Sequence, residues 1–100
     1  MAEGSRTLFK PIPGAGRIVA YTGTATANSA NSIAPANALA VAFYCTTAAH
    51  VCVDRVKTAA TTTDFPVLAS VPVTLGCEPG DNISAIQQAS GGSLGYVWLC

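Results

Sequence analysis

The sequence predicts an all-β protein: a small, antiparallel, jelly-roll-like β-sandwich with an extended N-terminal arm. Three observations support this fold class. Short hydrophobic runs that alternate large with small or polar residues recur at spacings of about 8–15 residues. Segments rich in Gly, Pro, Asn, Ser and Asp, which favour turns, separate these runs. No segment of the sequence has a convincing helical period.

The 100 residues make one domain of unusual composition, with 50% hydrophobic and only 10% charged residues. An average soluble domain has about 25% charged residues. Because repulsion between charged surfaces helps to keep soluble proteins apart, a surface this poor in charge is a liability for a free monomer. We therefore expect much of the surface to be covered when the protein is in use.

The charge pattern argues against two classes of partner. The formal net charge is zero, and the scattered basic residues form no stripe that would attract the phosphates of a nucleic acid. The N-terminus carries Glu3 and Pro11 where a signal peptide needs a basic start and an apolar run. The longest apolar stretch, residues 38–45, is far shorter than the roughly 20 residues of a membrane-spanning helix. We expect synthesis in the cytoplasm and neither a nucleic-acid nor a membrane partner.

The first predicted elements are an arm, a strand and a loop. Residues 1–16 contain two prolines and three glycines and lack periodicity, which indicates an extended arm. Residues 17–23 predict the first strand of a single β-sandwich domain that spans residues 17–100. Residues 24–37 are rich in Asn, Ser and Pro and predict a loop that could cross between sheets.

Residues 38–55 predict a β-hairpin. Large residues alternate with mostly small ones along residues 39–45, and a second alternating run follows a small-residue turn. A two-residue turn would pair Cys45 with Cys52. A three-residue loop would instead pair Cys45 with Val51, and we prefer this register because it keeps the apolar side chains of both strands on one face.

The remaining segments predict three strands joined by loops. Residues 71–75 predict a short strand at a sheet edge or bulge, because Pro72 has no N–H for a central ladder. The other predicted elements are a polar loop at residues 57–66, a tight turn at 78–81 and strands at 82–87 and 94–100.

The four cysteines predict neither a disulfide framework nor a metal site. Nothing indicates secretion, so we expect buried thiols that act as small hydrophobic residues. Cys45, His50 and Cys52 are close in sequence, but they lack the paired Cys knuckles of a structural zinc site. His50 is expected at the surface, in the turn of the hairpin.

The sequence carries no recognisable catalytic set. The single histidine, His50, has no nucleophile motif near it, and Asp54 is the only carboxylate close to it in sequence. Asp64 and Asp81 are interpreted as loop and turn residues. Residues 13–17 form a glycine-rich turn without the Lys-Ser/Thr of a phosphate loop. We predict that the protein is not an enzyme and has no cofactor or metal.

The aromatic residues Tyr44, Tyr96 and Trp98 have two interpretations. They could form a stacking platform for a carbohydrate or a base. In a strand pattern, however, such residues are more often part of the core or of a subunit interface, and we favour that interpretation.

From residue 38 onward, the order of elements resembles a group of small virion proteins of tailed bacteriophages. The matching text is "ALAVAFYCTTAAHVCVDR", then a Thr-rich loop, then "FPVLASVPVTLGCEPGDNISAIQQASGGSLGYVWLC". The family pattern closes on a polar strand, whereas this chain has Gly95 inserted and closes on Val97-Trp98-Leu99-Cys100. This departure predicts that the last strand is buried against a neighbouring subunit.

The resemblance implies a head decoration, or cement, protein that binds over joints of the capsid on the virion surface and stabilises the shell. It implies the major capsid protein as partner and a homo-oligomer, with a trimer favoured. Another virion role (head fibre base, neck or tail) and a carbohydrate-binding β-sandwich remain as alternatives. The arm and the last strand supply the candidate interface residues, which are Phe9, Pro11, Ile12, Pro13, Tyr96, Trp98 and Leu99.

Overall fold

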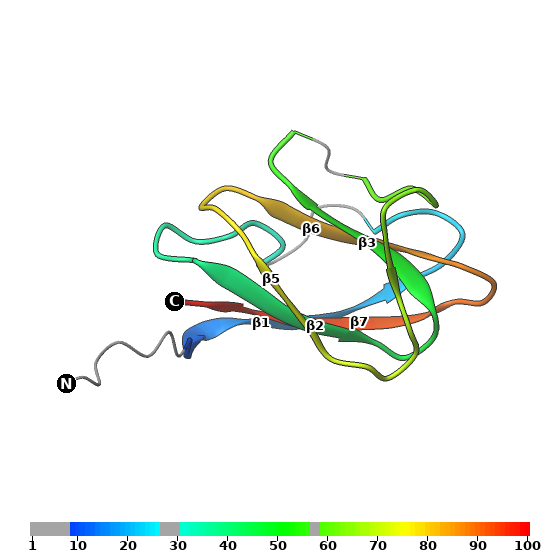
Figure 1. Cartoon of the computed structure of the whole chain (residues 1–100), viewed down its shortest axis with the longest axis horizontal. Coiled ribbons are helices and arrows are strands. Elements are labelled where there is room, and N and C mark those ends of the chain that lie inside the picture. Colours follow the sequence, from blue (N-terminus) through cyan, green and yellow to red (C-terminus); the bar gives the residue numbers. More distant parts are fainter. Residues whose placement is uncertain (1–8, 27–30, 57–58) are drawn as a thin grey trace.

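The computed structural model describes residues 9–26, 31–56 and 59–100, and these residues form seven β-strands and no helix (Figure 1). The start of the predicted arm and parts of two predicted loops lie outside the described residues. The strands are β1 (Pro11–Tyr21), β2 (Ala40–Cys45), β3 (Ala49–Asp54), β4 (Phe65–Val67), β5 (Val73–Gly76), β6 (Asn82–Gln87) and β7 (Gly92–Leu99).

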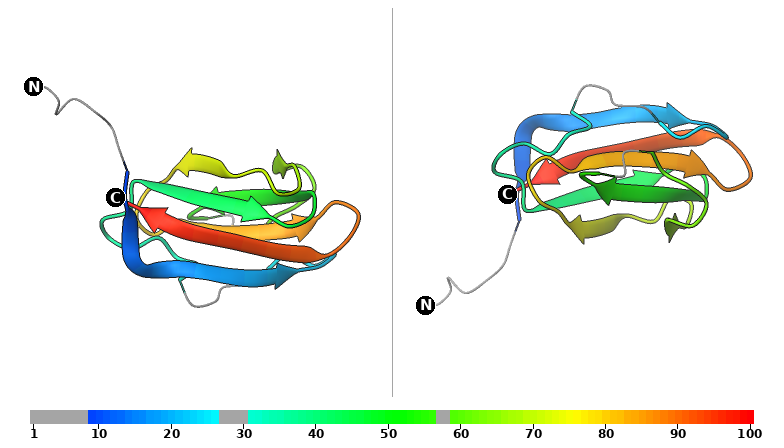
Figure 2. Two further views of the ribbon diagram at one scale, coloured as in Figure 1. Left: turned by 90° about the horizontal axis from the view of Figure 1, so that it is seen from below. Right: turned by 90° about the horizontal axis from the view of Figure 1, so that it is seen from above.

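The strands make two antiparallel sheets that pack face to face. One sheet has the order β1-β7-β2-β5 and the other has the order β4-β3-β6. Figure 2 shows the two layers from opposite sides, with the four-stranded sheet nearer the viewer on the left. Apolar side chains from the inner faces of both sheets form one core, as in other β-sandwiches. The predicted all-β sandwich is confirmed.

The pairing of strands is nested, which is how the chain of a jelly roll is wound. β1 pairs with β7, β2 with β5 and β3 with β4, so the chain folds back on itself as one long hairpin that wraps into two sheets. A fourth nested pair joins β6 to the segment between β1 and β2, and it consists of isolated contacts only. Thr26 N–H donates to Ala85 O (2.9 Å), and Ile33 forms an isolated bridge with Asn82.

The predicted hairpin at residues 38–55 is wrong, because β2 and β3 lie in different sheets. Neither proposed register for Cys45 occurs, since β2 pairs with β5 and β7 while β3 pairs with β4 and β6. Tyr21 holds the crossing: its hydroxyl donates to Thr47 O (2.7 Å) and accepts from Thr47 N–H (3.1 Å). The apolar faces of the two runs meet across the core instead of sharing one face.

β1 begins at Pro11, so the second half of the predicted arm belongs to the sandwich. Pro11 pairs with Leu99 and Gly16 with Val97, and the register shifts between these two points. Gly14 lies in this irregular stretch at φ 77°, where a side chain would be strained. Lys10 and Cys100 exchange two backbone hydrogen bonds of 3.0 Å. The prolines and glycines had concealed this strand, because they interrupt its alternation.

The later predictions largely agree with the structure. β5 is an edge strand that starts just after Pro72, as predicted. The turn at residues 78–81 closes with Asp81 N–H donating to Glu78 O (3.1 Å) and with Gly80 at φ 92°, which is type II geometry. β4 falls largely in the segment predicted as a polar loop, so this part of the prediction is wrong. The strand is short, contains Pro66 and lies at the edge of the three-stranded sheet.

Candidate functional site: an uncovered sheet face

The outer face of the three-stranded sheet is covered by the chain itself. Ser84, on the outer side of β6, accepts a hydrogen bond from Ala60 N–H (3.0 Å) and donates to Thr26 O (3.0 Å). His50 Nδ1, on β3, donates to Asp64 O (3.1 Å). Segments from two loops therefore lie over this sheet, and the Ser84 side chain has no exposed area.

The outer face of the four-stranded sheet has no such cover. Figure 2 (left) looks onto it and shows no segment over the middle of β7 and β2; the start of β1 passes only the C-terminal end of β7, where Ala40 and Leu99 are buried. Around the centre of this face the side chains are apolar or absent, and Ile18 is 65% and Tyr44 40% exposed, whereas Thr74 and Ser93 lie towards its margins. We call this surface the bare face; it comprises Gly16 and Ile18 on β1, Ala42 and Tyr44 on β2, Gly95 and Val97 on β7, and Pro72 at the rim.

The centre of the bare face is shaped by a glycine beneath an aromatic ring. Tyr44 pairs with Gly95 across β2 and β7, and Ile18 pairs with Gly95 from β1. A Cβ atom at Gly95 would lie 2.5 Å from Tyr44 Cζ, so the ring occupies the space that a side chain would need. The absence of a side chain lets the tyrosine lie down on the sheet.

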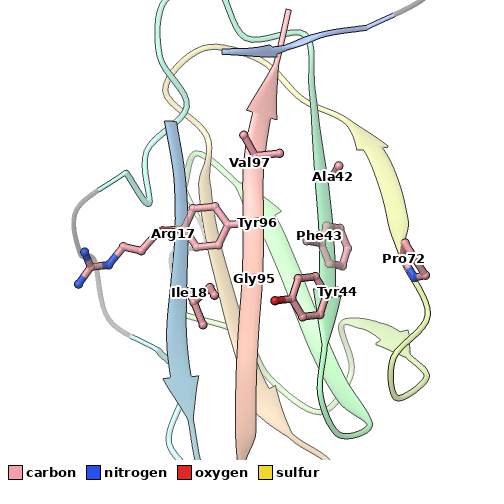
Figure 3. A pocket seen from close by; sticks show the side chains of 9 residues that line it. All are labelled: Arg17, Ile18, Ala42, Phe43, Tyr44, Pro72, Gly95, Tyr96 and Val97. Carbon is pink, nitrogen blue, oxygen red and sulfur yellow. The ribbon is translucent and has the colours of Figure 1, made fainter. Parts of the chain in front are cut away.

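A shallow depression of about 390 Å³ lies over this centre. Figure 3 shows Ile18 and Tyr44 on opposite sides of β7, with Gly95 between them and Pro72 beyond β2. Among the described residues, Arg17 is the only charged one that lines the depression. Its side chain extends away from β7, past the edge strand β1 (Figure 3). The depression therefore presents an apolar surface without converging polar groups.

A second hollow, at one end of the sandwich, is polar. Arg55 donates to Pro79 O (2.6 Å) and lies 3.9 Å from a carboxylate oxygen of Glu78, with both side chains well exposed. Such exposed ion pairs contribute little to stability. The described residues contain no group of three His, Cys, Asp or Glu side chains placed to hold a metal ion. The hollow is lined by Leu39, Asp54, Arg55, Gly76, Cys77, Glu78 and Asp81.

The candidate interface residues separate into two groups. Phe9 is 47% exposed, Pro11 and Pro13 are exposed, and Ile12 is partly buried against the core. Tyr96, Trp98 and Leu99, in contrast, are buried by the chain itself. The expectation that a neighbouring subunit buries these three residues is therefore corrected: Tyr96 and Trp98 point into the core from the central strand β7, and Leu99 is only 8% exposed within the chain.

The aromatic residues do not form a platform. Trp98 has no exposed area and donates from Nε1 to Asn31 O (2.7 Å). Tyr96 packs edge-on against Trp98, with 6.2 Å between ring centroids. Only Tyr44 of the three reaches the surface; Tyr96 and Trp98 lie in the core, which is one of the two locations expected for them.

The cysteines and His50 are not brought together as a site. Cys45 lies in the core at the end of β2, while His50 and Cys52 lie on β3 in the other sheet. His50 is half-buried in a strand, and its predicted place in a turn is wrong. The four cysteines form no disulfide. Burial raises the pKa of the Cys45 thiol, and the hydrogen bond with Tyr21 opposes this effect in part.

Both carboxylates that were interpreted as turn residues act as such. The Asp64 carboxylate accepts hydrogen bonds from Thr61 N–H (2.7 Å) and from the Thr61 hydroxyl (3.2 Å). The Asp81 carboxylate accepts from Glu78 N–H (2.9 Å). These bonds hold loops in place.

Sequence reasoning missed Ile18, Ala42 and Gly95 as parts of a surface. Their signal was present in the alternation of the strands, because Ala42 and Tyr44 share one face of β2. What the alternation could not show is which face of the strand would remain uncovered.

Comparisons of the chain with family models, with curated proteins and with solved structures find no match. The described residues include no helix that is long and apolar enough to cross a membrane.

Proposed function

We propose that this protein is a structural component of a phage virion, of the head decoration type, and that it acts by association with other protein surfaces. The observation that carries the proposal is the bare face: the middle of one side of the sandwich is left apolar and almost free of charge. Exposed apolar patches of this kind mark interaction sites on soluble domains.

The chemistry of the bare face supports association over ligand binding. A small-molecule site combines an apolar lining with a few polar groups that converge on the ligand. The depression beside Tyr44 lacks converging polar groups, since the Arg17 side chain points away from it. Depletion of charge is, in contrast, the mark of the buried core of a protein–protein interface.

The virion role rests on the resemblance of residues 38–100 to small phage head proteins in their order of parts. The winding of the chain is compatible with it, because viral capsid domains use jelly rolls, although lectins use them as well. The partner implied is the major capsid protein. Phe9, Pro11 and Pro13 are exposed where the chain enters β1, and we assign the shell contact to this end.

The test is the number of copies in purified virions of the phage that encodes the chain. Copies in a fixed ratio to the major capsid protein are expected. A few copies per particle would place the protein at the neck or tail instead, and no copies would overturn the virion role. Deletion of residues 2–8, with Phe9→Ser in addition, is expected to lower the occupancy of the shell. The matched control is Val56→Ser, which changes an exposed apolar residue far from the N-terminus in sequence.

A further inference from the structure

We infer that the bare face pairs with the bare face of a second copy of this chain, around a two-fold axis parallel to β7. The inference rests on the associative role proposed above and names its partner. It extends beyond that role because it assigns this face to self-association, whereas the shell contact is assigned to the end that carries Phe9. It also replaces the expected trimer with a two-fold pair.

Electrostatics favour a copy of the same chain as the occupant. A surface that meets its own copy can place like charges opposite each other, and like charges across an interface cost several kcal/mol. The depression has one charged lining residue, Arg17, which lies on the β1 side. A two-fold axis along β7 places the two Arg17 side chains at opposite edges of the pair, so they do not face each other.

The shape of the bare face is also complementary to that of a second copy. Ile18 stands on one side of β7 and is 65% exposed, whereas Tyr44 and Pro72 lie on the other side. Rotation by 180° around an axis along β7 exchanges these two sides. Ile18 of each copy then lies over the ring of Tyr44 of the other, and both contacts form at once, as an isologous interface requires.

Gly95 makes the contact possible, because it lets the ring of Tyr44 lie against the sheet. A ring held in this way offers a flat apolar surface on which an aliphatic side chain can pack. Because the ring lies over Gly95 and does not stand up from β2, the two sheets can approach. Two sheets packed face to face are separated by about 10 Å, which is the arrangement already present in the core of this sandwich.

The first measurement is the molar mass of the full chain in solution, by sedimentation equilibrium over a range of concentrations. A dimer is expected. Ile18→Asp buries a charge at each Tyr44 contact, and we expect it to raise the dimer Kd by at least about tenfold. Val56→Asp is the matched control, because Val56 is 88% exposed and follows β3 of the other sheet. Its Kd is expected to equal that of the unchanged chain.

A charge-pair experiment tests the two-fold axis itself. Tyr44→Lys is also expected to weaken the homodimer. In a mixture of Ile18→Asp and Tyr44→Lys chains, one Asp–Lys contact and one unchanged Ile18–Tyr44 contact form, so a heterodimer is expected. Ile18→Thr keeps the β-branched shape and serves as a milder variant if the charged chains lose their β-sheet circular dichroism; it is expected to weaken the dimer by less than Ile18→Asp does.

The outcomes separate this inference from the proposed function. A monomeric or trimeric chain, a dimer insensitive to Ile18→Asp or to Ile18→Thr, or a mixture that stays monomeric would each overturn the pairing. A chain that is monomeric in solution and abundant on the capsid would overturn the pairing and leave the virion role intact. A chain that dimerises through the bare face but is absent from virions would overturn the virion role and leave the pairing intact.

Discussion

The two sheets of the sandwich treat their outer faces differently. The three-stranded sheet is covered by loops of the same chain, and the buried Ser84 hydroxyl is bonded to that cover. The four-stranded sheet is apolar around the centre of its outer face, and exposed side chains such as Ile18 and Tyr44 lie on it. The chain covers one face internally and leaves the middle of the other uncovered, and this uncovered face is where we propose association. Substitutions should therefore affect folding on one face and association on the other.

The largest effect on folding is expected at Ser84. Ser84→Ala leaves Ala60 N–H and Thr26 O without their partner, and a buried group left unsatisfied costs about 1–3 kcal/mol. Urea unfolding of the two proteins measures the loss. Ser93→Ala, on the outer side of β7, is the matched control and is expected to change stability by less than about 0.5 kcal/mol. Equal losses at both serines would remove the distinction between the faces.

A smaller effect is expected at the centre of the bare face. Gly95→Ala forces the ring of Tyr44 off the sheet, and overpacking typically costs about 1–3 kcal/mol. Because this ring can swing towards solvent, we expect the lower end of that range. In a Tyr44→Ala background the same substitution should cost nothing, since the ring is absent. A double-mutant cycle measures the coupling, and additive losses would contradict the account of Gly95 as the residue that positions Tyr44.

The smallest expected effect is a difference in the rates at which two buried cysteines react, which reports local opening of the cover and requires no substitution. Cys52 lies opposite Ser84 under the cover of the three-stranded sheet, whereas Cys45 lies in the core. We expect a thiol reagent to label Cys52 when the cover opens locally and Cys45 only on global unfolding.

Mass spectrometry of the labelled peptides over a range of pH measures both rates. Because the thiolate reacts and burial raises the pKa of Cys45, labelling of Cys45 should still increase with pH above about 8.5, where an exposed thiol levels off. Equal labelling rates at Cys45 and Cys52 would show that the cover opens no more often than the core, which would contradict this prediction.

The alternation along single segments was sufficient to predict several strands. Residues 82–87 were predicted as a strand and form β6, and Pro72 correctly indicated an edge. Alternation failed where prolines and glycines interrupt it, as in β1, and where a strand is very short, as in β4.

The pairing of strands was harder to predict than their positions. Residues 39–45 and 51–54 were assigned to one hairpin because they are adjacent in sequence. In the structure they lie in different sheets, and the crossing is held by Tyr21, which is far away in sequence. Partner choice depends on such long-range contacts, and local alternation carries no information about them.

The sequence by itself determined the all-β class, the turn chemistry at residues 78–81 and the low content of charged residues. These are local or compositional properties, because turns and alternation depend on neighbouring residues. Only the tertiary structure decided that Trp98 and Tyr96 belong to the core and that Tyr44 lies at the surface over Gly95. The physical reason is that a strand has two similar faces, and which one is covered depends on where the rest of the chain packs.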